Sequence, residues 1–344
     1  MKRRNALLAT LATALALSVG AGLAAPAAWA QSPLPIRIGY QATGDWLLFT
    51  AKELKLFEKA GLVVPSWVRF STGAQMIAAM QDGTIDVSTP GSVPFLRGLA
   101  EGLDWVAIGI YEEGAYAEGM VARKDSGIDT IPHLRGKRIG YVAGSTAHYG
   151  LVMTLRQYGV NLNEVKLLNM TPEAQLAAMT KGEIDAAMVW EPMLQRMVHD
   201  ANARVILREG DLGIRTNVGV YCVRRDWLRD NREAGVRFLR AILMANDALL
   251  TDHRVGVRAL ASELSVKESW AEAIYQVEPP PRVVSWADSR YGYSLVSGSA
   301  FHRRLGYLAT FLYEQKIITN PVDVSDALDA SVITEAVRTR KQGQ

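Results

Sequence analysis

The chain has 344 residues, of which 49% are hydrophobic, and a formal net charge of +3. Lys2, Arg3 and Arg4 supply three of the 38 basic residues, and none of the 35 acidic residues lies among the first thirty, so the rest of the chain is balanced in charge. This balance argues against nucleic-acid binding and against a polybasic membrane role. The single cysteine, Cys222, excludes an intrachain disulfide and a thiolate metal cluster.

The first thirty residues have the pattern of a secretory signal peptide. "MKRR" is a basic start, an uncharged apolar run follows, and "AWA" at 28–30 has the small residues of a cleavage site. We predict cleavage after Ala30 and a periplasmic location. The alternative is an uncleaved anchor, because the run is long enough to span a membrane. The Arg3-Arg4 pair leaves both ordinary and twin-arginine export open. Residues 31–344 have the length of about two domains.

Strand and helix patterns alternate through the first part of the mature chain. Helical stretches between the strands end near Gly61 and Gly83, and a third helix begins at Ser92 with Pro94 in its first turn. This order predicts a parallel sheet with helices on its faces. The predicted strands are "IRIGY" (36–40), "VPSWVRF" (64–70), "IDVSTPG" (85–91) and "WVAIGIY" (105–111).

A second run repeats this order. Its predicted strands are "GKRIGYV" (136–142), "VKLLNM" (165–170) and "IDAAMVW" (184–190), with helices between and after them. The stretch "AAMTKGEID" (177–185) also echoes "AAMQDGTID" (78–86): each predicts a helix end, a glycine cap and a strand beginning Ile-Asp. We interpret the echo as two similar α/β lobes. The alternative is chance, because helices that end in glycine before a strand are common in α/β proteins.

Two apolar segments that end in a basic pair and Asp bracket the second run. They are "EGMVARKD" (118–125) and "VGVYCVRRD" (218–226). We interpret them as crossover strands that leave the first lobe and return to it. The predicted fold is α/β, with two lobes joined by two crossover strands and a ligand cleft between the lobes. The predicted boundaries are 31–120 with 221–344 for lobe 1, completed by the helices after 226, and 121–220 for lobe 2.

Three loops follow strands and precede helices: 41–46, 88–94 and 143–149. In open parallel sheets, ligands bind at the carboxyl ends of strands. Helix starts there offer free N–H groups and partial positive charge, which suits an anion. None of the three loops contains Arg or Lys, so we expect main-chain amides and the Ser92, Ser145 and Thr146 hydroxyls to hold an oxyanion. Simple N-capping is the alternative for each hydroxyl taken singly.

Other polar and aromatic side chains are candidates for the same pocket. A carboxylate could accept a ligand ammonium; the alternative is helix capping for Asp45 and a solvated rim position for Glu118 and Glu191. Trp46, Trp190 and Tyr149 could wall the pocket or pack in the core. His148 could donate to an oxyanion or lie at the surface.

Residues 36–320 resemble a family, most clearly through "VRFSTGAQMIAAMQDGTIDVSTPGSVP", "GSTAHYG" and "VWEP". They are similar to the periplasmic substrate-binding proteins of taurine, alkanesulfonate and nitrate ABC importers, and most of all to the taurine-binding member. The resemblance implies the α/β, two-lobed periplasmic-binding fold of type II, whose lobes close on the ligand by hinge motion. It also implies roles for individual residues. Gly91, Ser92, Ser145, Thr146 and Tyr149 match positions that hold the sulfonate, and Gln41, Asp45, Glu118 and Trp190 match other pocket positions.

One position departs from the taurine-binding pattern. Asn217 stands before the second crossover strand, where that pattern has an acid. An amide holds an ammonium less strongly than a carboxylate does, so another sulfonate or a related small anion stays open as the ligand.

The predicted function is the solute-binding component of an ABC importer. It binds taurine or a related small sulfonate and delivers it to a membrane permease with its ATPase. We expect a monomer without enzymatic activity, cofactor or metal. One alternative is a binding protein for nitrate, bicarbonate or a thiamine-precursor pyrimidine. An enzyme of the same fold is a weaker alternative, because no G-x-S-x-G, H-E-x-x-H, P-loop or C-x-x-C motif is present. A regulator's ligand-sensing domain is disfavoured by the export signal.

Overall fold

Two five-stranded sheets organise the computed structural model of the chain, which describes residues 32–114, 116–214 and 217–340. The predicted signal peptide, residues 1–30, lies outside the described residues. From Pro33 onward the chain forms one unit. Among the described residues, no helix combines the length and the apolar character needed to cross a membrane.

The first sheet has the strand order β2-β1-β3-β10-β4. Strand β1 pairs in parallel with β2 and β3, whereas β10 runs antiparallel to both of its neighbours. The second sheet has the order β7-β6-β8-β5-β9, and its antiparallel member is β5. The bounds are β1 (Leu34–Gln41), β2 (Leu62–Phe70), β3 (Val87–Ser88), β4 (Trp105–Glu112), β5 (Glu118–Arg123), β6 (Arg138–Tyr141), β7 (Lys166–Asn169), β8 (Ala186–Trp190), β9 (Ala203–Arg208) and β10 (Gly219–Arg224).

The two sheets therefore have the same topology, as the echo in the sequence predicts. Strands β5 and β10 are the predicted crossover strands, and each enters the sheet of its lobe next to the last strand. The predicted parallel pairing holds for β1 with β2 and β3, whereas the two crossover strands run antiparallel to their neighbours. A crossover strand enters its lobe at the cleft, where the neighbouring strands end, so it must run antiparallel to them. Both proposed lobe boundaries, 120/121 and 220/221, fall within crossover strands.

The repeated Ile-Asp stretch has one structural role in both lobes. Asp86 pairs with Arg37 through Nε (3.0 Å) and Nη2 (2.6 Å), which joins the middle of β1 to the residue before β3. Asp185 pairs with Arg138 through the same two nitrogens at the same two distances, and joins β6 to β8. Bidentate Arg–carboxylate pairs fix geometry as well as adding energy. The echo thus preserves a clamp between the first and third strands of each lobe.

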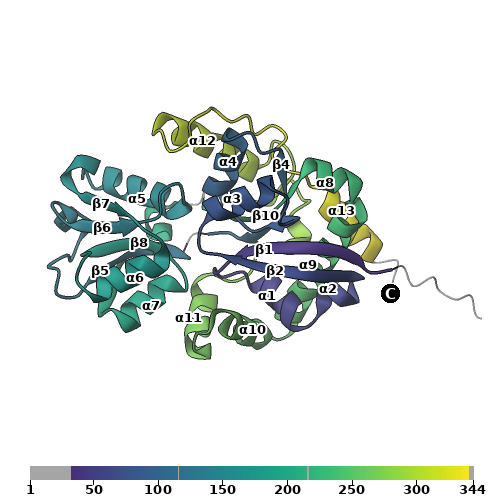
Figure 1. Cartoon of the computed structure of the whole chain (residues 1–344), viewed down its shortest axis with the longest axis horizontal. Coiled ribbons are helices and arrows are strands. Elements are labelled where there is room, and N and C mark those ends of the chain that lie inside the picture. Colours follow the sequence, from purple (N-terminus) through teal and green to yellow (C-terminus); the bar gives the residue numbers. More distant parts are fainter. Residues whose placement is uncertain (1–31, 115, 215–216, 341–344) are drawn as a thin grey trace, which may run out of the picture. The chain divides into compact units, whose positions relative to one another are not determined.

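Helices cover both faces of each sheet. In the second lobe α5 packs on one face, and α6 with α7 packs on the other, as Figure 1 shows. The α-helices are α1 (Trp46–Glu53), α2 (Leu56–Lys59), α3 (Gly73–Gln81), α4 (Ser92–Ala100), α5 (Thr146–Gln157), α6 (Pro172–Thr180), α7 (Met193–Asp200), α8 (Arg225–Asp230), α9 (Arg232–Thr251), α10 (Arg254–Leu264), α11 (Glu268–Val277), α12 (Ala300–Glu314) and α13 (Ser331–Arg340). Short 3-10 turns are Ile131–Leu134, Leu162–Glu164, Glu209–Leu212 and Val283–Ser285.

Alternation along β5 shows how one strand supports two cores. Met120 and Ala122 belong to the apolar cluster under α5, whereas Val121 belongs to the cluster under α6 and α7. Successive strand residues point to opposite faces of a sheet. A strand buried on both faces therefore reads as a continuous apolar run, which is how this segment reads in the sequence.

Candidate ligand-binding site

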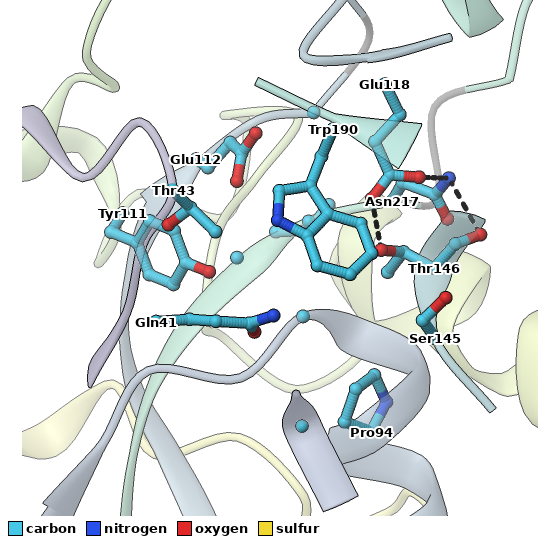
Figure 2. Close-up of a pocket in the computed structure, with 15 residues that line it drawn as sticks. Gln41, Thr43, Pro94, Tyr111, Glu112, Glu118, Ser145, Thr146, Trp190 and Asn217 are labelled. Atoms are coloured by element: carbon cyan, nitrogen blue, oxygen red, sulfur yellow. Dashed lines mark hydrogen bonds between the residues drawn. The ribbon is translucent and has the colours of Figure 1, made fainter. Parts of the chain in front are cut away.

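A cavity lies where the strands of both sheets end, and it takes its lining from both lobes (Figure 2). The cavity is narrow: its volume of about 30 Å³ holds roughly two water molecules, so a solute of several heavy atoms requires its walls to move apart. The lining residues are Gln41, Thr43, Gly73, Gly91, Pro94, Tyr111, Glu112, Gly114, Glu118, Ser145, Thr146, Trp190, Asn217, Val218 and Gly219.

Helix starts form one side of this cavity. Helix α3 begins at Gly73, α4 follows Gly91, and α5 begins at Thr146 after its Ser145 cap. The first amides of a helix have no partner within the helix and carry its positive dipole end. Among the described residues that line the cavity, none is basic. The arrangement can therefore hold an anion through main-chain N–H groups. Helix α1, which follows the predicted loop 41–46, does not reach the cavity, and α3 lies there instead.

Glycines allow the backbones to approach one another here. A Cβ added to Gly91 would lie 2.8 Å from Cγ2 of Thr146, which belongs to the other lobe. A Cβ added to Gly114 would overlap the main-chain oxygen of Asn217, and the φ of Gly114 is +55°. Any larger residue at Gly114 must therefore displace the segment before β10.

Glu118 provides a carboxyl group on the cavity wall. It is the first residue of β5 and is almost fully buried. It accepts hydrogen bonds from the Thr146 hydroxyl and from Nδ2 of Asn217, the latter at 3.0 Å. Burial raises the pKa of Glu118 to about 7, although these hydrogen bonds favour its charged form. A cation placed beside Glu118 would therefore convert it fully to carboxylate near neutral pH.

Glu112 provides a second carboxyl group. It is the last residue of β4, and no hydrogen bond to its side chain is present among the described residues. Burial, and then the neighbouring carboxyls of Glu278 and Glu118, raise the pKa of Glu112 well above its ordinary value. In the view of Figure 2 the Trp190 ring lies between Glu112 and Glu118. No basic side chain among the described lining residues is present to balance the charged form of Glu112.

Seven of the predicted site residues line the cavity together, and none of their roles in binding is tested by this placement. They are Gln41, Gly91, Glu118, Ser145, Thr146, Trp190 and Asn217. The other six lie outside the lining: Asp45, Trp46, Ser92, His148, Tyr149 and Glu191.

The three predicted residues of the first lobe that lie outside the cavity lining have structural partners. Asp45 caps α1 by accepting from the Leu48 amide, and it also accepts from the Tyr221 hydroxyl at 2.7 Å. The indole N–H of Trp46 donates to the main-chain oxygen of Glu278 at 2.8 Å. The main-chain N–H of Ser92 donates to the oxygen of Val218 at 2.7 Å.

The three predicted residues of the second lobe that lie outside the cavity lining also contact other parts of the protein. His148 accepts from the Gly144 amide, and burial lowers its pKa to about 4, so it is neutral at pH 7. The Tyr149 ring packs edge-on against Phe311. Glu191 forms an ion pair with Arg208 at 2.8 Å. Each side chain lies close in sequence to a lining residue, which is why the sequence alone does not separate them from the lining.

The residues not predicted from the sequence include Gly73, Glu112 and Glu209, which lie at or behind the cavity wall. Glu112 directly follows the predicted strand 105–111, so the rule that ligands lie at carboxyl ends of strands applies to it as well. Gly73 lies within the quoted "RFSTGA" at a helix start. Glu209, which lies behind Asn217, has no sequence signal that we can name.

Comparison with known proteins places the chain in a family. The putative aliphatic sulfonates-binding protein of Escherichia coli K12 is 28% identical over 296 residues, covering 85% of this chain and 88% of that protein. The taurine-binding periplasmic protein of the same organism is 24% identical over 224 residues, covering 65% and 69%. The resemblance predicted from the sequence is thereby confirmed.

Solved structures share the fold. The alkanesulfonate-binding protein SsuA from Xanthomonas axonopodis pv. citri, bound to MOPS, is 24% identical with a TM-score of 0.73, over 86% of this chain and 98% of that chain. The desulfurization enzyme DSZB also shares it, at 18% identity and a TM-score of 0.65. The model of the family described as "NMT1/THI5 like" matches residues 46–253, which is more than half of the chain. The chain belongs to the NMT1/THI5-like family.

Proposed function

We propose that this protein is the periplasmic solute-binding component of an ABC importer and that its solute is a small amino-sulfonate. One observation carries the proposal: a single cavity joins helix starts from both lobes to the carboxyls of Glu112 and Glu118, with no basic side chain among its described lining residues. The names of the relatives, which bind sulfonates or taurine, support the sulfonate part.

The charge of the cavity favours a zwitterion over a simple anion. Two like charges roughly 4 Å apart repel by about 4 kcal/mol at the effective dielectric constant of a protein site. A sulfonate without a cationic group would meet this repulsion whenever Glu112 and Glu118 are charged, and it escapes the repulsion only in the protonated state that their raised pKa values favour. A solute that carries an ammonium beside its sulfonate places opposite charges against the helix starts and the carboxyls. Taurine has this pattern.

Binding would favour closure of the lobes, because the cavity contacts come from both of them. Gly73 and Gly91 belong to the first lobe, whereas Ser145 and Trp190 belong to the second. A ligand shifts a conformational equilibrium by its difference in affinity for the two states. A solute that touches all four residues has more contacts when the lobes are together. A closed, loaded protein is what a membrane permease and its ATPase would then recognise.

The Ser145 and Thr146 hydroxyls on the cavity wall already donate their protons within the protein, Thr146 to the carboxyl of Glu118. Ser145 donates to the main-chain oxygen of Val142 at 2.7 Å and accepts from the His148 amide, so it acts as a helix cap. Cys222 lies in the core of the first sheet, and burial raises the pKa of its thiol well above the ordinary value. We therefore assign no chemical step to this protein. We propose export through the signal pattern of residues 1–30.

A thermal-shift screen of the purified protein tests this function. The panel is taurine, ethanesulfonate, sulfate esters, nitrate, bicarbonate and a thiamine-precursor pyrimidine. We expect taurine or a close amino-sulfonate to stabilise the protein by about 3 kcal/mol at a hundredfold excess over Kd, and ethanesulfonate to act only at higher concentration. A response to the pyrimidine or to nitrate alone would reject the sulfonate assignment.

A further inference from the structure

Helix α11 packs on the first lobe, but its Trp270 side chain does not join the core there. Ala271 and Ile274 of this helix are buried in the apolar cluster of the first sheet. Among the described residues, the apolar clusters of the two lobes do not include Trp270, which is partly exposed. Tryptophan is highly buried on average, so a tryptophan outside the core needs another explanation.

The Trp270 ring contacts the second lobe instead. It stacks on the His199 imidazole near the end of α7, with ring centroids 4.4 Å apart and an angle of 8° between the planes. Leu194 and Met197 of α7 are buried in an apolar cluster of the second lobe, so the stack joins the two lobes. Aromatic ring pairs contribute more than the area that they bury. The Lys267 Nζ lies 5.6 Å from the centroid of the Trp270 ring, so the ring also has a partner in its own lobe.

A second aromatic contact between the lobes differs from this one. The Tyr149 ring of α5 packs edge-on against Phe311 of α12, which lies on the opposite side of the first lobe from α11 (Figure 1). Tyr149 is buried and belongs to the apolar cluster of the first lobe, so this contact continues the core. His199 is exposed, and its stack with Trp270 lies outside the apolar clusters of the described residues. The stack can therefore be made and lost without disturbing either core.

The two stacked rings lie away from the solute. His199 and Trp270 are not among the described residues that line the cavity. A contact between the lobes is lost when they part, whereas the contacts within each lobe are kept. The stack therefore favours the closed protein by an amount that does not depend on the chemistry of the solute. A larger population of the binding-competent state raises the apparent affinity in proportion.

We propose that the His199–Trp270 stack is a latch that stabilises the closed protein and raises its affinity for every solute by the same factor. The inference rests on the part of the proposed function in which the lobes close on a solute, and not on the sulfonate assignment. A bound solute leaves only when the lobes part, so the latch slows its release. The open protein captures the solute without the stack, so the rate of association does not depend on the latch.

Calorimetry and stopped-flow kinetics on a double-mutant cycle test the latch. The variants are His199→Ala, Trp270→Ala and the double variant. The ligands are taurine, ethanesulfonate and any other solute of the thermal-shift panel that binds. We expect each single variant to weaken the binding of every ligand by roughly fivefold, through faster release. The double variant should bind no more weakly than the weaker single variant, because both changes remove the same contact.

The matched control is Tyr307→Ala, which removes a 75% exposed aromatic side chain of the first lobe and should leave all affinities unchanged. Unchanged affinity in both single variants would overturn the latch, and so would losses that multiply in the double variant. A loss confined to one ligand would mean that the rings act on the solute itself, which also overturns the proposal. If no solute of the panel binds the wild-type protein, the proposed function is rejected and the latch with it.

Discussion

Glu118→Gln is expected to weaken taurine binding by about 100-fold or more, while the affinity for ethanesulfonate stays the same or rises. Truncating one partner of a buried charge pair costs roughly 2–5 kcal/mol, and each 1.4 kcal/mol is a tenfold change. Glutamine keeps the size of Glu118 and an acceptor for the Thr146 hydroxyl, and its new NH2 group can pair with Asn217 once the Asn217 amide turns over. Ethanesulfonate lacks the ammonium, so removal of the carboxylate costs it nothing. Isothermal titration calorimetry with both ligands measures the two effects.

The matched control for this substitution is Glu183→Gln, which should leave both affinities unchanged. Equal losses for taurine and ethanesulfonate in Glu118→Gln would mean that the carboxylate supports the cavity and does not bind an ammonium. A gain for both ligands would show that the anion end of the solute lies nearest to Glu118.

Taurine affinity is expected to rise with pH between 5 and 8. The pKa of Glu118 is raised to about 7 in the empty protein, mainly by burial. An ammonium beside it favours the carboxylate, so binding below pH 7 must release a proton, and affinity falls by up to about tenfold for each pH unit below that value. Burial and the neighbouring acids raise the pKa of Glu112 and Glu209 as well, which extends the rise above pH 7. His148, with a pKa of about 4, is neutral throughout this window.

The stability of the ligand-free protein should change in the opposite direction. A carboxyl whose pKa is raised by folding stabilises the fold below its ordinary pKa, and this contribution is lost as pH rises through the folded value. For Glu118, a rise from 4.5 to about 7 corresponds to about 3 kcal/mol. Asp45, also raised to about 7, adds a loss over the same range. The melting temperature without ligand should therefore fall from pH 5 to pH 8. A flat profile for both melting temperature and affinity would show that these acids do not titrate in this window.

The order of strands and helices along the chain could be predicted from the sequence because it depends on local patterns. Alternating apolar residues, glycine caps such as Gly83 and Gly182, and the echo of Ile-Asp all depend on short-range physics. The direction in which β5 and β10 run does not depend on such local patterns. Their sequences are apolar runs that suit either direction, and only the path of the chain between the two lobes makes them antiparallel.

The site was predictable where it follows backbone geometry. Ser145 and Thr146 lie at a helix start after a strand, and they line the cavity. Side chains beside them, such as His148, point elsewhere because helix rotation decides which residues reach the cavity. Glu209 was beyond prediction for another reason. The buried position of the Glu209 carboxyl depends on Gly150, which lies far from Glu209 in the sequence. Because Gly150 has no side chain, it leaves the space that the carboxyl fills.

A crystal structure of the protein with taurine bound would test the central claim most directly. We predict sulfonate oxygens about 3 Å from main-chain nitrogens in the first turns of α3 and α5, with the ammonium within hydrogen-bond reach of Glu118. A sulfonate bound instead to Arg69 and Arg196, which line a separate cavity that shares Gln41 and Trp190 with this one, would contradict it.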